Sequence, residues 1–435
     1  MRERKFARPV WVIQFNELGK DEAPKPVLFG DKSMKPGTAA YDGRENLPHH
    51  AGAPTGLQFS AAVGPDTYTE WLKAIPPHAT ASLYLHVPFC RSLCWHCGGH
   101  TSVCHRDEPI AVYEAALRCE IDLVSRQIDR RIKVDHIHFG GGTPTIMAPE
   151  SFSDLIGSLR QAFFVLPSAE IAVEVDPRRL GAAMIGALAL GGVNRASLGV
   201  PCLDPAVQRA INRVQSFDQT AAATQALRRA GIAGIDFDLT YGLPHQTVAS
   251  CLDTVRRSVE LGPDRFAVSG YLHAPAFGKH QRMINQAWLP DRLARLDQSD
   301  AIANALTEAG YVQIGPGHFA LPGDAMGVAP REGRLRRNFR GTTDTSDILL
   351  GFGASAIGRL TPGYVQNEID IRSYSALIAG GVLATARGYA FPDGPVEIDG
   401  TSPVLIDGSF FPIRSVAAAF DAHLDGSRHL HSRAV

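Results

Sequence analysis

Three cysteines in one short segment are the residues of this chain best suited to chemistry. Cys90, Cys94 and Cys97 stand in YLHVPFCRSLCWHC (84–97), at C-x-x-x-C-x-x-C spacing. One loop can direct three thiolates at this spacing to a single centre, and thiolates prefer soft partners such as zinc or an iron–sulfur cluster. A fourth protein ligand would close a structural site, whereas three ligands leave one position open for chemistry. The spacing predicts a metal or cluster site.

Other interpretations of these cysteines remain open from the loop alone. Cys104 could complete a four-cysteine zinc site. Four nearby histidines are further candidate ligands: His86, His96, His100 and His105. Cys94 and Cys97 also form a C-x-x-C pair of the thiol–disulfide kind. Each thiol could equally be a buried core residue, because free cysteine is among the most buried residue types.

The elements that must position the loop follow a regular order along the chain. Short apolar, β-branched runs alternate with amphipathic helical patterns, which predicts parallel β/α units closed or partly closed into a barrel. The predicted strands are 82–87, 135–139, 171–175, 194–199, 235–239 and 266–271. The predicted helices are 109–128, 150–163, 219–231, 250–262 and a stretch near 291–309.

Glycine or polar residues follow each predicted strand in turn. In a β/α barrel the loops at the carboxyl ends of the strands build the active site. Any one of these residues could be a helix cap, a salt-bridge partner or a tight turn, but six consecutive strand ends of this kind indicate one pocket. The glycine run at 140–142 leaves backbone amides free to approach a ligand. The residues at the strand ends are Cys90–Cys97, Gly140–Thr145, Glu174 and Asp176, Ser197–Cys202 with Arg213, Asp238, and Tyr271 with His273.

Length and composition describe an ordinary globular protein. The chain has 435 residues, 45% of them hydrophobic, and a formal net charge of −1, which points to neither nucleic acid nor an anionic membrane as partner. We find no signal-peptide core and no apolar stretch long enough to span a membrane. Seven cysteines, an odd number, fit thiol or metal chemistry in a reducing compartment. The expectation is a cytoplasmic protein.

Four regions are expected along the chain. Residues 1–77 are rich in Pro, Gly and Lys and predict an irregular arm or leader. Residues 78–285 hold the barrel, and 286–385 form a barrel extension with substrate-side helices. Residues 386–435 lose the helical pattern and predict an atypical, short tail.

Several motifs together resemble one known family. YLHVPFCRSLCWHC, HIHFGGGTPT, IAVEVDP, VQRAINR, DFDLTYGLPHQT and LLGFGASAIG occur in this order between residues 84 and 358. They are similar to motifs of the radical S-adenosylmethionine (SAM) family, and within it of the oxygen-independent coproporphyrinogen III oxidases. The resemblance implies a partial (β/α)6 barrel that carries a 4Fe-4S cluster on Cys90, Cys94 and Cys97.

The resemblance also implies the ligands and the reaction. SAM would bind the open iron, and a 5′-deoxyadenosyl radical would convert two propionates of coproporphyrinogen III to vinyls. A flavodoxin or ferredoxin-type protein would donate electrons to a monomeric enzyme. The positions that match a first SAM are Tyr84, Gly141, Glu174 and Ile357. Those that match a second are His96, Gly142, Thr143, Arg213, Asp238 and Leu272. A basic run of Arg331, Arg334, Arg336, Arg337 and Arg340 could bind substrate carboxylates.

The sequence departs from the family pattern at four places. A further cysteine of the family is Gly99 here, and a glutamine of the second SAM pocket is Pro201, which has no amide side chain and no backbone donor. An aromatic motif before the barrel appears as PHHAGAPTG (48–56), and the tail lacks the family's helical C-terminal pattern. The departures leave two alternatives: a radical enzyme acting on another tetrapyrrole, and a non-catalytic haem-binding relative.

Overall fold

The computed structural model describes residues 59–276, 278–315, 317–332 and 346–391, with short strands at 46–47, 405–406, 409–410 and 432–433. It divides into two compact units, one of residues 54–401 and one of residues 1–53 and 402–434. The barrel and the cysteine loop belong to the first unit. Arg334, Arg336, Arg337, Arg340, the 48–56 motif and most of the tail lie outside the described residues. The second unit contains the strand pairs β1 (Asn46–Leu47) with β18 (Ser432–Arg433) and β16 (Leu405–Ile406) with β17 (Ser409–Phe410).

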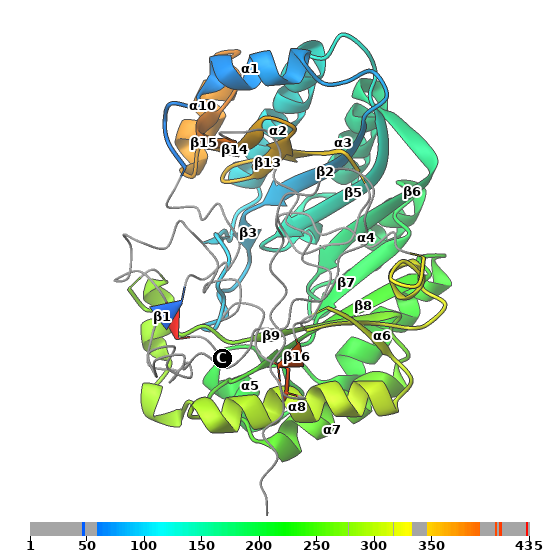
Figure 1. The fold of residues 1–435 in the computed structure, drawn as a ribbon, viewed down its shortest axis with the longest axis vertical. Helices are drawn as coiled ribbons and strands as arrows, with labels where there is room; N and C mark the ends of the chain where they lie inside the picture. The colour runs from blue at the N-terminus through cyan, green and yellow to red at the C-terminus, as the bar shows by residue number, and fades with distance from the viewer. Residues whose placement is uncertain are drawn as a thin grey trace, which may run out of the picture. The chain divides into compact units, whose positions relative to one another are not determined.

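The predicted six parallel strands are confirmed, in sequence order and side by side (Figure 1). Their register brings the expected strand ends together: Glu174 pairs with Ser197, and Gly199 pairs with Asp238. Because all six strands are parallel, their carboxyl ends lie at one end of the barrel. The strands are β2 (Thr80–Val87), β5 (Lys133–Gly141), β6 (Phe164–Val175), β7 (Arg195–Gly199), β8 (Gly234–Tyr241) and β9 (Arg265–Gly270).

Helices connect the strands. The predicted helices are confirmed within a few residues as α2 (Glu108–Arg126), α3 (Pro149–Ala162), α6 (Phe217–Arg229), α7 (Val248–Glu260) and α8 (Arg292–Glu308). Capping boxes at Ser216 and Thr247 fix the starts of α6 and α7. Helix α4 (Ala182–Leu190) has no amphipathic pattern that would predict it, because AAMIGALAL is apolar all round. The short α5 (Pro205–Ala210) begins at the Asp204 cap.

Both edges of the barrel sheet are extended by strands that the periodicity did not predict. On one side, β9 pairs with β11 (His318–Ala320), which pairs with β10 (Val312–Gly315). On the other side, β2 pairs with β12, so the region 286–385 contributes to both edges of the same sheet. The added strands beyond β2 are β12 (Ile348–Phe352), β13 (Ile357–Leu360), β14 (Gly363–Asn367) and β15 (Thr385–Ala390). The same region contains helices α9 (Ala325–Val328) and α10 (Ile371–Ala379).

The irregular leader expected over residues 1–77 ends earlier than predicted. Residues Pro65–Lys73 form helix α1, with Tyr68 and Leu72 buried. The helix was missed because it is short and has few apolar positions, so its burial is decided by tertiary packing rather than by periodicity. An isolated bridge between Ser60 and Gly388 ties the chain before α1 to β15.

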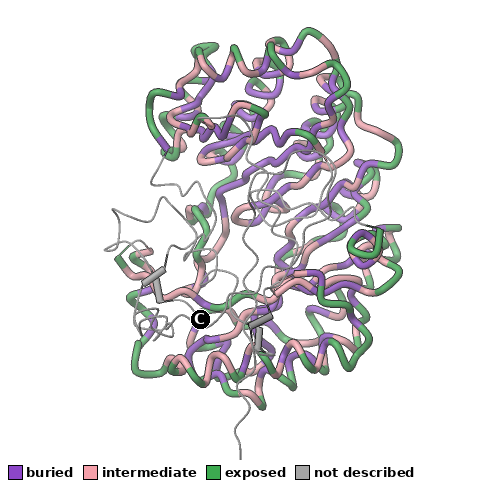
Figure 2. The backbone as a smooth tube through the Cα atoms, viewed as in Figure 1, coloured by how far each residue is buried: buried purple, intermediate pink, exposed green. Residues whose placement is uncertain are grey.

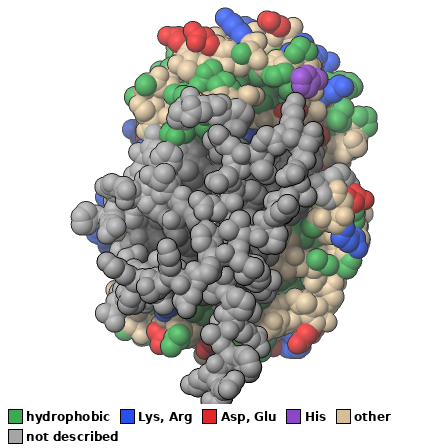
Figure 3. All heavy atoms as spheres, in the orientation of Figure 1, with side chains coloured by type: hydrophobic (Ala, Val, Ile, Leu, Met, Phe, Trp, Pro, Cys, Tyr) green, Lys and Arg blue, Asp and Glu red, His purple; other side chains and the backbone are tan. Residues whose placement is uncertain are grey.

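The core follows the barrel strands and the inner faces of the helices (Figure 2). At the end where the strands begin, Arg195 forms ion pairs with Glu170, Asp236 and Asp324, and Arg265 pairs with Glu170 and Asp324. This charged layer lies opposite the cysteine loop. Acidic and basic side chains are interspersed at the visible edges of the described part (Figure 3). Within the described residues, no helix combines the length and the apolar character needed to cross a membrane.

One buried carboxyl joins α2 to the added strands. Glu120 accepts hydrogen bonds from the Gly353 amide (2.7 Å) and the Tyr374 hydroxyl (2.7 Å), and from the Asn367 side chain (2.5 Å). Burial raises its pKa to about 7, even though these donors favour the ionised form. The folded state therefore holds the proton more tightly than the unfolded chain. This contribution to stability is complete below the unfolded pKa of about 4.5 and is lost as the pH rises through about 7.

We expect Glu120→Gln to weaken the pH dependence of stability between pH 5.5 and 8. The substitution removes the titrating proton while keeping one acceptor oxygen, and the mismatched amide should destabilise the fold by about 1–3 kcal/mol at low pH. Thermal unfolding at both pH values measures the effect. An unchanged difference in Tm between the two pH values would contradict this role of Glu120.

Candidate active site

The cysteine loop leaves the carboxyl end of β2 and is held by its own backbone. It contains the short strands β3 (Phe89–Cys90) and β4 (Ser102–Val103), which pair in parallel. The Cys97 amide donates to the Cys94 carbonyl at 3.1 Å. The Cys90 sulfur and the Thr143 hydroxyl share a hydrogen bond of 3.2 Å. Burial raises the pKa of the Cys90 thiol to about 11, so binding of a cation there would have to displace a proton.

Two neighbouring segments clamp the loop from outside. The Trp95 amide donates to the Ile211 carbonyl at 2.9 Å, and the Asn212 side chain donates to the Leu93 carbonyl at 2.9 Å. Asn212 has φ 53°, a left-handed conformation that asparagine tolerates better than most residues. On the other side, the His280 ring bonds to the Cys97 carbonyl at 2.7 Å; His280 lies in the 3-10 helix η3 (Lys279–Met283). The loop is thus fixed at both its middle and its end.

The Cys104 thiol is engaged by a backbone carbonyl. It donates to the Arg106 carbonyl at 3.1 Å, and the Cys104 side chain is part of the main hydrophobic core. The His86 ring bonds to the Tyr84 hydroxyl (3.0 Å) and to the His100 carbonyl (3.2 Å). In the described residues, no three or more His, Cys, Asp and Glu side chains are grouped so that they could hold a metal ion. The assignment of Cys90, Cys94 and Cys97 as cluster ligands therefore stays a prediction.

The glycine run packs the end of β5 against the cysteine loop. A Cβ at Gly142 would lie 2.5 Å from the Phe89 carbonyl oxygen, and one at Gly140 would lie 2.6 Å from a Glu174 oxygen. The expectation of free amides is wrong for this run. The Gly142 and Thr143 amides donate to the Val87 and Phe89 carbonyls at 2.9 Å each. The glycines therefore allow close backbone packing.

Glu174 is oriented by two groups of β5. Its two oxygens contact the His138 ring nitrogen (3.0 Å) and the Gly141 amide (2.9 Å). The Tyr84 ring stacks on His138, with 5.8 Å between centroids. Sequence reasoning missed His138, although it lies two residues before Gly140 and so shares its side of β5.

Ile357 is brought to Tyr84 by the added strands. It is the first residue of β13, and the preceding Ala356 packs with Tyr84 and Leu349 in one buried cluster. Since β12 pairs with β2, residues far apart in the sequence meet at the first predicted SAM position.

Asp238 is a second carboxyl near the same end of the barrel. The Ser197 hydroxyl donates to it at 2.9 Å. Burial raises its pKa to about 7, and the charge of Glu174 adds to the effect. Glu174 pairs with Ser197 in the sheet, and Ser197 contacts Asp238, so the two carboxyls lie near each other at this end of the barrel.

Two arginine side chains lie beside the Cys94 sulfur. Arg213 donates to the Gly199 carbonyl at 2.8 Å and lies 3.6 Å from the Cys94 sulfur, while its Nε is buried and has no partner among the described residues. Arg178, which sequence reasoning missed, lies 3.7 Å from the same sulfur and pairs with Asp176. The signal available in the sequence was the short Asp-x-Arg spacing. An unsatisfied donor beside a cysteine sulfur fits an anionic ligand at this place.

Four other positions were singled out from the sequence: His96, Leu272, Pro201 and Gly99. Burial and the charges of Arg213 and Arg178 lower the pKa of His96 to about 3. Leu272 is half-buried and is the second residue after β9. Pro201 is buried, and its carbonyl accepts the Thr240 amide at 3.0 Å. A Cβ at Gly99 would lie 3.9 Å from the Cys97 sulfur, an ordinary contact.

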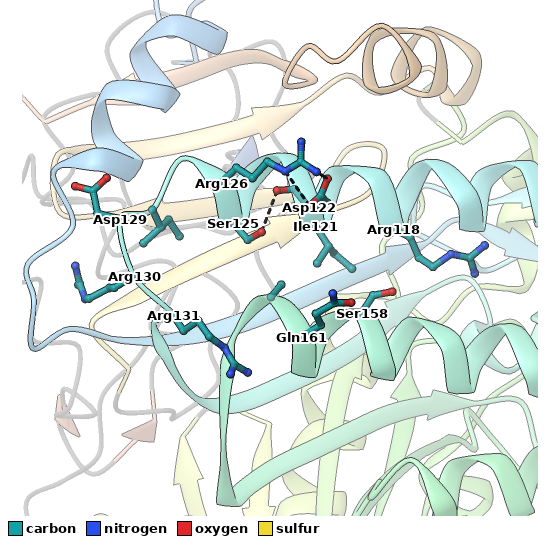
Figure 4. Close-up of a pocket in the computed structure, with 12 residues that line it drawn as sticks. Arg118, Ile121, Asp122, Ser125, Arg126, Asp129, Arg130, Arg131, Ser158 and Gln161 are labelled. Atoms are coloured by element: carbon teal, nitrogen blue, oxygen red, sulfur yellow. Dashed lines mark hydrogen bonds and ion pairs between the residues drawn. The ribbon is translucent and has the colours of Figure 1, made fainter.

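One surface hollow of the described residues lies away from this site. It has a volume of about 460 Å³ and lies between the C-terminal half of α2 and α3, near the beginnings of β2 and β5 (Figure 4). Its arginines are largely engaged: Arg126 pairs with Asp122, and Arg131 donates to the Phe163 carbonyl at 2.8 Å.

Arg331 is the described member of the predicted basic run, and it donates to the Pro322 carbonyl at 2.6 Å.

Known proteins resemble this chain in both sequence and fold. The model of the radical SAM superfamily matches residues 84–257. The oxygen-independent coproporphyrinogen III oxidase of Bradyrhizobium diazoefficiens is 56% identical over 92% of this chain and 100% of the relative. That of Paracoccus denitrificans is 41% identical over 81% of this chain and 78% of the relative. The solved structure of coproporphyrinogen III oxidase from Escherichia coli, a radical SAM enzyme, is 37% identical, and the match covers 79% of each chain with a TM-score of 0.75.

Proposed function

The chain belongs to the oxygen-independent coproporphyrinogen III oxidases of the radical SAM superfamily, and from this membership we infer its reaction. It is an oxidoreductase of haem biosynthesis that converts two propionates of coproporphyrinogen III to vinyls, giving protoporphyrinogen IX. The position of the cysteine loop is the structural observation that supports this inference. The loop leaves the carboxyl end of β2, in the same barrel end as Glu174 and Asp238.

The family's cofactors are a 4Fe-4S cluster and SAM. When bound, they would supply the radical chemistry by which each propionate is converted to a vinyl group. We assign the cluster to Cys90, Cys94 and Cys97. The donor set supports this assignment, because three thiols lie on one loop and Cys104 is engaged elsewhere. All seven cysteines are unpaired thiols, which supports action in the reducing cytoplasm.

Residues of the chain itself bind and orient the SAM molecules. Glu174, held by His138 and Gly141, is oriented to accept hydrogen bonds from the first SAM, and we assign Tyr84 and Ile357 to the same cofactor. A second SAM would take His96, Gly142, Thr143, Arg213, Asp238 and Leu272. The unpartnered Nε of Arg213 supports that pocket, and Pro201, which offers neither an amide side chain nor a backbone donor, weakens it. We propose a monomer that receives electrons from a flavodoxin or ferredoxin-type protein.

The experiment that tests the function uses the full chain after anaerobic cluster reconstitution. Reductant, SAM and coproporphyrinogen III are supplied, and 5′-deoxyadenosine and protoporphyrinogen are measured. Both products are expected. Cleavage of SAM without a vinyl product would contradict the proposed substrate and favour another tetrapyrrole. A full cluster without SAM cleavage would favour a non-catalytic haem-binding protein.

The raised pKa of Asp238 predicts a pH dependence of SAM binding. Asp238 is mostly neutral at pH 6 and mostly ionised at pH 8, because its pKa is about 7. SAM carries a sulfonium cation, so its affinity should rise up to about tenfold over this range. Equilibrium dialysis of the reconstituted protein measures the dissociation constant. Asp238→Asn should flatten the profile, whereas Asp253→Asn, at an exposed pair with Arg256, should not. A profile unchanged by Asp238→Asn would contradict the assignment.

A further inference from the structure

We propose that Arg178 is a positioning residue that acts through Cys94 to set the reduction potential of the bound cluster. The inference rests on the proposed function, because it requires a cluster on Cys94. Arg178 is not among the residues that the family resemblance connects with cofactor binding. It is identified by its contacts alone.

Arg178 is held rigidly beside the cysteine. Its Nε and Nη2 donate to the two oxygens of Asp176 at 2.8 Å and 2.6 Å, and its backbone amide donates to Asp176 at 3.1 Å. The same Nη2 reaches the Cys94 sulfur at 3.7 Å, within the range for a hydrogen bond to sulfur. The fork geometry of arginine permits both contacts at once.

Asp176 is ionised and serves as the anchor. It follows β6 directly and is buried. Burial opposes its ionisation, but the hydrogen bonds from Arg178 and the charge of Arg213 keep its pKa below the usual value. Asp176 therefore fixes the direction of the Arg178 guanidinium and at the same time offsets part of its charge.

Two arginines and one aspartate give the surroundings of Cys94 a net positive charge. Arg213 approaches the same sulfur at 3.6 Å and lies 3.7 Å from Asp176. Hydrogen bonds to cluster sulfurs and nearby charges are the means by which proteins set cluster potentials. Adding an electron makes the cluster more negative. A positive, donating neighbour therefore stabilises the reduced form and raises the potential.

The test compares cluster potentials without substrate, so it does not depend on turnover. Reconstituted wild type, Arg178→Gln and Asp176→Asn are titrated anaerobically against mediators, and the reduced cluster is followed by electron paramagnetic resonance. Arg178→Gln should lower the ratio of reduced to oxidised cluster about tenfold at a fixed potential, which is about 59 mV for one electron. Asp176→Asn should shift the potential in the opposite direction, because it removes a negative charge while its amide oxygen keeps one acceptor for Arg178.

A neighbouring residue provides the matched control. Arg179→Gln removes the same charge one position further, from an exposed side chain, and should leave the potential unchanged. If Arg178 and Asp176 had only a structural role, the two substitutions would reduce the cluster content without shifting the reduction potential in opposite directions. The proposal is overturned if Arg178→Gln binds a full cluster with the wild-type potential, or if Arg179→Gln shifts the potential equally. Failure of the wild type itself to bind a cluster would instead contradict the ligand assignment of the proposed function.

Discussion

Replacing Cys94 by alanine is expected to reduce the iron content of the reconstituted protein from about four atoms per chain to near zero. Cys94 is buried in the middle of the cysteine loop, with Arg178 and Arg213 directed at its sulfur. Two thiolates without the third cannot satisfy the cluster, so both the cluster absorbance and SAM cleavage should disappear. Iron and sulfide analysis after reconstitution, together with the absorption spectrum, measures the effect.

Two other cysteines serve as controls for this substitution. Cys104 is as buried as Cys94, but its thiol donates to the Arg106 carbonyl. Cys119 is exposed on α2. Alanine at either position should leave the iron content near the wild-type value. Full iron in Cys94→Ala, or loss of iron in Cys104→Ala with the fold intact, would show that the ligand set is different and would reopen the zinc interpretation.

The second large effect is expected from a single methyl group at Gly142. A Cβ there would lie 2.5 Å from the Phe89 carbonyl oxygen and 2.8 Å from its carbon, so backbone has to move. Overpacking of this kind destabilises a protein by about 1–3 kcal/mol. The strand that must shift is β3, which carries Cys90. A displacement near 1 Å at a reacting centre can lower a rate about a hundredfold. Gly142→Ala should therefore lose about that much SAM cleavage.

Gly98 provides the comparison for Gly142. It lies in the same loop, next to Cys97, but a Cβ at this position would meet no atom within 4 Å. Gly98→Ala should retain cluster, stability and SAM cleavage. Thermal unfolding and the amount of 5′-deoxyadenosine formed per minute separate the two variants. Equal activities of Gly142→Ala and Gly98→Ala would mean that the close packing of Gly142 against Phe89 is not required.

The sequence by itself determined the barrel and the order of its strand ends. Periodicity identified the six strands of the β/α units, since buried parallel strands are continuous β-branched runs and the helices between them are amphipathic. The spacing of Cys90, Cys94 and Cys97 indicated a thiolate site, and the motifs indicated the family. These features are local: each depends on a few neighbouring residues.

Only the tertiary structure decided what depends on contacts between distant segments. It extended both edges of the sheet, because β12 is recognised by its pairing with β2 rather than by any period of its own. It showed that the amides of Gly142 and Thr143 are used within the protein, which the type of residue cannot reveal. It showed that Arg178 and Arg213 both approach the Cys94 sulfur, and that His138 orients Glu174. Hydrogen-bond partners and electrostatic neighbours are set by the packing of the strands, so spacing along the chain could predict which residues meet but not how they are held.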